Sequence, residues 1–351
     1  MNLVTRFAEE NIAHILRSEI VPLCLIEPAV LEDSRFFVID DKINKQSACQ
    51  KWRYYLLSCI FSRVNYLSSR QINTVENPVI LDTRTGYVFN DFIDIPPSRQ
   101  LMSFTDFLKD KTGTYEPENG YVLLVQRPPG RRSLTEASSG LPLEEYLAEA
   151  LGKRGIPFKH CDFGTVSPHE QVEICRGASV MVGAHGAGLS NMIFTPRHCS
   201  VLEYNFRKYW YCDPVCDQHF SGALAYDEKC DSALTANRGF HKADFRNLSL
   251  LLDRTYKELD VVGFEGYHAR NPIGRNFMIV DGQQLVVEIE KHLDLSRARQ
   301  SDGYISGRRS EAEPYVGNPI NEAMSKRTLR KMKLRNVGRY LKSKVLMKKR
   351  V

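Results

Sequence analysis

Long hydrophobic runs are missing from this 351-residue sequence. A membrane-spanning helix needs about 18 or more consecutive apolar residues, and no stretch of the chain offers them. The first 19 residues mix charged and polar side chains into their apolar positions, at Arg6, Glu9, Glu10, His14 and Arg17. We therefore expect neither a spanning helix nor a cleavable signal peptide, and a cytoplasmic or peripheral membrane location.

Paired cysteines with the spacing of a zinc site are also missing. The nine cysteines are scattered, and an odd number cannot pair completely, so we expect most of them to be buried thiols. Cys212, Cys216 and Cys230 lie closer together, but C-x3-C with one further cysteine is a poor zinc spacing. We predict no metal site.

The composition is that of a globular protein with a basic tail. Hydrophobic residues at 42% and charged residues at 26% are ordinary values, and the length favours two domains. The net charge of +6 is misleading, because the segment after Glu322 holds twelve Lys and Arg and no acid. Without it, 36 basic residues face 42 acidic ones, so the folded body is mildly acidic.

A glycine-rich stretch within residues 179–205 predicts a strand, a tight loop and the start of a helix. An apolar run at 180–182 leads into Gly183, Gly186 and Gly188, and the apolar pattern resumes at Leu189. The glycine order is G-x-x-G-x-G, which excludes the G-x-G-x-x-G of dinucleotide sites. Neither a P-loop lysine nor the G-x-S-x-G of hydrolases accompanies it.

The loop from Gly183 to Gly188 has the features of a phosphate site. Glycines allow positive φ and a close approach to the backbone, and the N-terminus of the following helix attracts an anion. A βα turn that needs glycine only for its geometry is the alternative. His185 favours a ligand site, because the carboxyl end of a strand faces the crevice where open α/β sheets bind ligands.

Strands and helices alternate regularly from residue 121 onward. The expected strands are 121–126, 156–161, 180–182 and 201–203. A helix is expected at 141–153, and Ser167, Pro168 and Glu170 form a capping box for another helix, which ends near Gly177. This alternation predicts an α/β fold with a doubly wound parallel sheet.

Three arginines, Arg127, Arg131 and Arg132, follow the first of these strands in R-P-P-G-R-R-S. They occupy the same edge of the expected sheet as the glycine loop. Guanidinium groups offer forked donors and a permanent charge, which suit a diphosphate. The alternative is a solvated surface loop.

The string G-A-H-G-A-G-L-S-N, followed by F-x-x-P and V-L-E, resembles the signature of the family 61 glycosyltransferases. The resemblance covers residues 121–205. It implies transfer of xylose, N-acetylglucosamine or arabinose from a UDP-sugar with inversion, with the first two sugars favoured. It also implies two Rossmann-like lobes in the arrangement called GT-B, with the donor on the second lobe and a glycan or glycoprotein acceptor on the first.

The resemblance further implies which residues bind the donor. Arg127 matches an R-x(3,4)-R-like element of the family, and Arg131 or Arg132 its second member, because the insertion P-P-G leaves the alignment open. We expect the diphosphate against these side chains and the loop, and the ribose hydroxyls against Glu203. The loop residues in this set are Gly183, Gly186, Ala187, Gly188 and Asn191. His185 would contact the phosphate or the sugar.

The general base of an inverting transfer should come from the first lobe. Asp91, in V-F-N-D-F-I-D-I-P-P, is our candidate, with His185 as its substitute; the alternative for Asp91 is a turn residue. The His-Trp-containing first-lobe pattern of the family is not evident here. No D-x-D occurs in the chain, so we predict no required metal, and no cofactor besides the donor.

The remaining elements are less regular. We expect helices at 11–20, 51–67, 241–256 and 283–293, and short strands at 36–39 and 79–81. The polar, turn-rich residues 110–120 predict a domain boundary. The expected domains are an acceptor-side lobe at 1–115, a nucleotide-sugar lobe with closing helices at 116–322, and a basic tail at 323–351.

The basic tail interleaves its charges with apolar residues over 324–350. It could lie on an anionic membrane as an amphipathic helix, or be a solvated helical tail. No aromatic-rich face accompanies it, so we expect no nucleic-acid partner. Asn247 begins a glycosylation sequon, which matters only in a secretory lumen.

Two other functions compete with sugar transfer. A nucleotide-dependent oxidoreductase would need an acidic residue about twenty positions after a G-x-G-x-x-G, and neither is found. A non-catalytic protein that binds nucleotide sugars or glycans and has lost its base is the second alternative.

Overall fold

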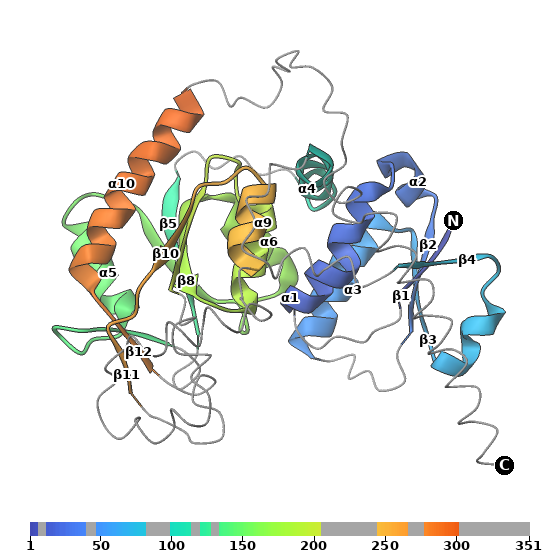
Figure 1. Cartoon of the computed structure of the whole chain (residues 1–351), viewed down its shortest axis with the longest axis horizontal. Coiled ribbons are helices and arrows are strands. Elements are labelled where there is room, and N and C mark those ends of the chain that lie inside the picture. The colour runs from blue at the N-terminus through green and yellow to red at the C-terminus, as the bar shows by residue number, and fades with distance from the viewer. Residues whose placement is uncertain are drawn as a thin grey trace, which may run out of the picture. The chain divides into compact units, whose positions relative to one another are not determined.

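A computed structural model describes residues 1–5, 12–39, 47–81, 99–113, 120–127, 133–204, 244–265 and 277–301 (Figure 1). Residues 1–308 form one compact unit and residues 309–351 a second, which lies outside the described residues. The boundaries predicted near 115 and 322 also lie outside them. The division into three domains therefore stays a prediction.

The first sheet has four parallel strands in the order β3-β2-β1-β4. These strands are β1 (Asn2–Thr5), β2 (Arg35–Ile39), β3 (Arg63–Leu67) and β4 (Pro78–Leu81). The strands expected at 36–39 and 79–81 are confirmed as β2 and β4. A central first strand with two successors on one side is the order of a Rossmann-like half.

Short helices surround this sheet. They are α1 (Ile12–Ile15), the π-helix η1 (Leu16–Ile20), the 3-10 helices η2 (Val21–Leu25) and η3 (Ser69–Thr74), and the α-helices α2 (Pro28–Glu32), α3 (Ala48–Ile60) and α4 (Arg99–Lys111). The helix expected at 11–20 is thus confirmed, with a π turn as its second half. Leu3, Phe36, Trp52 and Leu56 are fully buried.

The single helix expected at 51–67 is wrong in its second half. Helix α3 begins after Ser47, whose Oγ accepts a hydrogen bond from Gln50 N at 3.3 Å, and it ends at Ile60. The residues of β3 then pair in parallel with β2, with Val64 beside Phe36. Helical spacing continued through these residues, but pairing with a distant strand decided their conformation.

The second sheet has five strands, all parallel, in the order β10-β9-β8-β5-β7. Its strands are β5 (Tyr121–Gln126), β7 (Phe158–Asp162), β8 (Ala178–Ala184), β9 (Ser200–Tyr204) and β10 (Tyr256–Leu259). Strand β8 is buried along its whole length, as a central strand covered on both faces should be. The predicted doubly wound parallel sheet is confirmed.

Helices cover both faces of the second sheet (Figure 1). Helices α5 (Leu143–Gly152) and α10 (Gly282–Ser301) pack on one face through a buried core that includes Leu147, Ile289 and Val182. Helices α6 (Pro168–Arg176) and α9 (Asp244–Leu251) lie on the other. The capping box of Ser167 and Glu170 is confirmed at the start of α6.

A smaller sheet lies beside the second one. Strand β12 (Phe277–Val280) pairs in parallel with β6 (Leu134–Glu136) and antiparallel with β11 (Gly263–Glu265). The helix expected at 241–256 is corrected, since α9 ends at Leu251 and Tyr256 opens strand β10. The helix expected at 283–293 is confirmed within α10.

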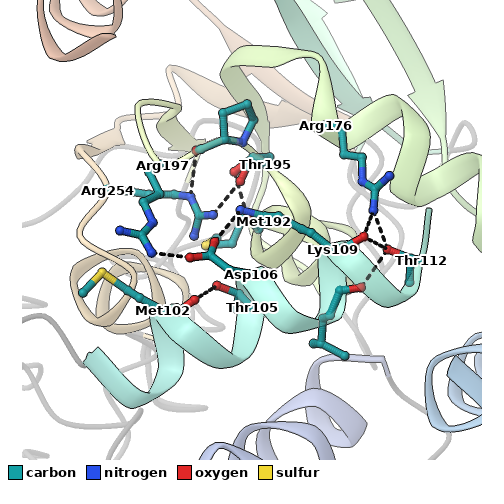
Figure 2. A network of polar contacts seen from close by, with 12 residues as sticks. Met102, Thr105, Asp106, Lys109, Thr112, Arg176, Met192, Thr195, Arg197 and Arg254 are labelled. Atoms are coloured by element: carbon teal, nitrogen blue, oxygen red, sulfur yellow. Dashed lines mark hydrogen bonds and ion pairs between the residues drawn. The ribbon is translucent and has the colours of Figure 1, made fainter. Parts of the chain in front are cut away.

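Helix α4 joins the two sheet regions through polar contacts (Figure 2). Asp106 of α4 pairs with Arg197, which precedes β9, and lies 3.6 Å from Lys109 Nζ. Arg176, at the end of α6, donates to the Lys109 and Gly113 carbonyls and, at 2.6 Å, to Thr112 Oγ1. Because β8 and β9 start just after Arg176 and Arg197, this junction lies at the amino edge of the second sheet.

Six of the cysteines are described, and all are free thiols, four of them buried. Burial raises the pKa of Cys24 to about 12. Cys212, Cys216 and Cys230 lie outside the described residues. In the part of the chain that the structure describes, no helix is both long and apolar enough to cross a membrane. Asn247 is buried in α9, so its sequon is closed to glycosylation in the folded chain.

Candidate functional site at the carboxyl edge of the second sheet

The winding of the second sheet reverses between β5 and β8. From β5 the chain adds β7 on one side, and it then adds β8, β9 and β10 on the other. In open α/β sheets, ligands bind outside the carboxyl ends of the strands at such a reversal. The two segments that leave the sheet there carry Arg127, after β5, and His185, after β8.

Arg127 and the glycine loop meet at this edge. The strands that carry them are neighbours, with Val125 of β5 beside Gly183 of β8. The Arg127 guanidinium covers Gly186, because a Cβ built on Gly186 would lie 1.7 Å from Arg127 Nη2. The arginine loop and the glycine loop, far apart in the sequence, therefore form one surface.

The glycines serve close packing and not positive φ, which corrects part of our expectation. None of Gly183, Gly186 and Gly188 has a left-handed φ, and Gly186 is extended at φ 161°. A Cβ on Gly188 would lie 2.7 Å from Val125 Cγ1, and one on Gly183 would lie 3.2 Å from Leu189 Cδ2. The loop needs glycine so that Arg127 and Val125 can approach its backbone.

His185 is buried at this edge and is held by a carboxylate. Its Nδ1 is hydrogen-bonded to Glu203 Oε1, on the neighbouring strand β9. Glu203 is 1% exposed, and its Oε2 accepts a hydrogen bond from the Tyr256 hydroxyl at 2.7 Å. The imidazole and the Phe245 ring pack edge to face, with ring centroids 5.1 Å apart.

This arrangement changes the role expected for Glu203. We predicted contacts with ribose hydroxyls, but both of its oxygens are bonded within the protein and the carboxylate is buried. A carboxylate on Nδ1 fixes the orientation and tautomer of the ring, so that Nε2 is the nitrogen for a substrate. Tyr256 and Phe245 were missed because nothing in the sequence indicates that β10 and α9 reach this edge.

Asn191 was expected to face the diphosphate, and the structure gives its side chain another position. The side chain is fully buried; its Oδ1 accepts from Trp52 Nε1 at 3.0 Å, and its Nδ2 donates to Gln171 Oε1 at 3.0 Å. Both polar groups of the amide are thus bonded to the protein. Asn191 anchors the loop from the inside and does not face a ligand.

The helix expected after the loop is present as a 3-10 helix, η5 (Ala187–Phe194). Leu189 N donates to Gly186 O at 3.0 Å, so this amide closes the first 3-10 turn. Ala187 and Gly188 are half-buried at the start of η5. They stay predicted donor contacts.

Three predicted site residues lie outside the described residues: Asp91, Arg131 and Arg132. Their roles as base and diphosphate ligands therefore stay predictions. Within the described ranges, no three His, Cys, Asp or Glu side chains gather closely enough to hold a metal ion.

Comparison with known proteins gives a match to a family model. No curated protein is similar enough to count as a relative. Residues 42–202 match the model of the family described as Glycosyltransferase 61. The matched range contains strands β5 and β8 with the Arg127 and His185 that follow them, and over this range the chain is similar to the family 61 glycosyltransferases.

Proposed function

We propose that this glycosyltransferase moves xylose or N-acetylglucosamine from a UDP-sugar to a glycan or glycoprotein acceptor, with inversion. In this proposal the second sheet binds the donor and the first sheet faces the acceptor, in the arrangement called GT-B. The parallel order of both sheets supports it. The reversal between β5 and β8 is the edge at which such sheets bind nucleotides.

The observation that carries the proposal is the contact of Arg127 with Gly186, beside His185. As the sugar leaves, negative charge grows on the diphosphate, and cations and donors already in place stabilise it. Arg127 offers forked N–H donors over the backbone of Gly186, which has no side chain that would block a ligand. The diphosphate would lie between this guanidinium and the loop.

His185 belongs to the leaving-group side in this mechanism, because it lies on the same edge as Arg127. With Glu203 accepting from Nδ1, the ring presents Nε2 to the diphosphate, and an imidazolium, which carries a proton on both nitrogens, would donate a hydrogen bond from Nε2 to a phosphate oxygen. Inversion then needs a base on the opposite face of the sugar. We assign this role to Asp91, in the first part of the chain.

Metal-free catalysis is part of the proposal. The chain contains no D-x-D, so Arg127 and His185, with Arg131 or Arg132, would supply the positive charge that a metal supplies in other transferases. Activity should therefore survive dialysis against EDTA. A complete loss that Mn²⁺ restores would contradict this part.

A panel of UDP-sugars tests the donor assignment. Incubation of the purified chain with UDP-xylose or UDP-N-acetylglucosamine and an acceptor glycan library should release UDP and give a product of inverted anomeric configuration. Arg127→Ala and His185→Ala should each abolish turnover while the melting temperature stays near that of the wild type. Release of UDP at the wild-type rate by both variants would contradict the site.

The basic tail at 324–350 is proposed to contact anionic membranes through a basic amphipathic helix. Truncation after Glu322 should weaken binding to phosphatidylserine vesicles. Equal binding by the truncated and full-length chains would contradict membrane contact.

A further inference from the structure

A chain of buried hydrogen bonds connects helix α3 to the glycine loop. Trp52, on α3 beside the first sheet, donates through Nε1 to Asn191 of η5 at 3.0 Å. Asn191 donates to Gln171 of α6 at 3.0 Å. Gln171 Nε2 in turn donates to the Phe163 carbonyl at 2.8 Å.

Every side-chain polar group in this series of hydrogen bonds has a partner. Each residue donates to the next, from Trp52 toward the Phe163 carbonyl. Trp52 can only donate, so it fixes the Asn191 oxygen on its own side and turns the amide nitrogen toward Gln171. Trp52 and Asn191 are fully buried and Gln171 is 2% exposed, so water does not replace a lost bond. A buried amide without a hydrogen-bond partner costs free energy, so these bonded side chains have one stable arrangement.

Two members of this series of hydrogen bonds lie beside the proposed phosphate loop. Asn191 lies three residues beyond Gly188 in the same 3-10 helix. At the other end, Phe163 packs beside the loop, because a Cβ on Gly188 would lie 3.5 Å from Phe163 Cδ2. The loop is thus held from η5 and from the segment after β7, and the hydrogen bonds of Gln171 connect these two supports.

We propose that Trp52 and Gln171 are positioning residues for the donor loop, so that the first sheet region sets the shape of the phosphate site on the second sheet. Neither residue touches the diphosphate. The identity of the ligand, UDP, rests on the proposed function. The link from Trp52 to the loop through hydrogen bonds does not rest on it. Donor binding and the acceptor side are coupled through Trp52 as a consequence.

The structure also supplies a matched control. The α4 junction joins the same two sheet regions through Asp106 and Arg197, but it lies at the amino edge of the second sheet. Asp106→Asn removes the charge of this junction with little change in size. If a weaker contact between the two sheet regions is by itself enough to change the loop, the change should appear in Asp106→Asn as well as in Trp52→Phe.

The first experiment needs no ligand. Trp52→Phe keeps an aromatic ring and removes the N–H, which leaves Asn191 Oδ1 unpaired. Hydrogen exchange of residues 183–194, followed by mass spectrometry, should become faster in Trp52→Phe and stay at the wild-type rate in Asp106→Asn. If Trp52→Phe does not fold, Gln171→Met unpairs the other end of Asn191 and should give the same result. Unchanged exchange, or equal increases in the test and control variants, would overturn the proposal.

The second experiment measures binding of UDP by calorimetry. Loss of one buried hydrogen bond should weaken UDP binding about tenfold in Trp52→Phe and leave it unchanged in Asp106→Asn. In donor kinetics the KM should rise in the same ratio, while a purely structural change would lower the active fraction and leave KM alone. A Trp52→Phe protein with wild-type affinity and KM would overturn the proposal. If the wild type itself does not bind UDP but the exchange result holds, the donor assignment is wrong and the link to the loop stands.

Discussion

His185 and Glu203 are bonded to each other across two neighbouring parallel strands, at the edge from which Arg127 also leaves the sheet. The contact follows from the strand register, in which Gly183 of β8 lies beside Glu203 of β9. Since the second carboxylate oxygen is bonded to Tyr256, Glu203 is a fixed support for the imidazole. The site thus combines the Arg127 guanidinium, which lies over the glycine loop, with His185, whose ring is held in one orientation.

Glu203→Gln should separate support of His185 from binding of ribose. The substitution keeps the size of the side chain and removes the charge that orients Nδ1, so turnover should fall about 100-fold while UDP affinity changes little. Steady-state kinetics and calorimetry measure the two effects. A ribose ligand would behave in the opposite way, with UDP affinity lost first and with a strong preference of the wild type for UDP over its 2′-deoxy analogue.

Two further variants should give smaller losses of turnover than Glu203→Gln. Tyr256→Phe removes one hydrogen bond to Glu203 and should reduce turnover less than Glu203→Gln. Glu258→Gln changes the carboxylate beside Glu203 on strand β10 and should stay close to wild type.

Gly186→Ala should remove donor binding as effectively as Arg127→Ala. The new methyl group would lie 1.7 Å from Arg127 Nη2, so the guanidinium must leave the loop. Because this is the far end of a flexible side chain, we expect stability to fall by only about 1 kcal/mol. Gly152→Ala is the control, since no atom lies within 4 Å of its Cβ position. UDP titration of both variants checks this, and wild-type affinity in Gly186→Ala would show that Arg127 is not needed at the loop.

Glu136 should make the fold sensitive to acid. Burial acts to raise the pKa of this carboxyl, but hydrogen bonds from the hydroxyls and amides of Ser139 and Ser138 outweigh it and lower the pKa from 4.5 to about 2. A lowered pKa contributes stability that is complete above the unfolded value and is lost as the pH falls through the folded value. Glu136→Gln should therefore cost about 2 kcal/mol at pH 7 and almost nothing near pH 2. Urea unfolding across this range measures the difference, and a cost independent of pH would contradict the assignment.

Local signals decided what the sequence could predict. The capping box at Ser167 and the apolar run of β5 act within a few residues, and both were predicted correctly. Residues 63–67 fit a helix equally well until β2 is known to lie beside them. Tyr256, the partner of Glu203, and Trp52, the partner of Asn191, come from distant parts of the chain, so no local pattern could reveal them.

The glycines illustrate the same limit at the site itself. Their type and order predicted a loop that another group approaches closely, and Arg127 does so. Of the two reasons expected, close approach is confirmed and positive φ is wrong, because the crowding of Val125 and Arg127 makes glycine necessary without a left-handed backbone. Sequence alone does not distinguish these two uses of glycine.

A crystal structure of the chain with UDP tests the central claim most directly. The account predicts the diphosphate against residues 186–188, with one phosphate oxygen within 3.2 Å of the Arg127 guanidinium and another facing His185 Nε2. A diphosphate bound at the amino edge, or bound with Arg127 and His185 both turned away from it, would contradict the account.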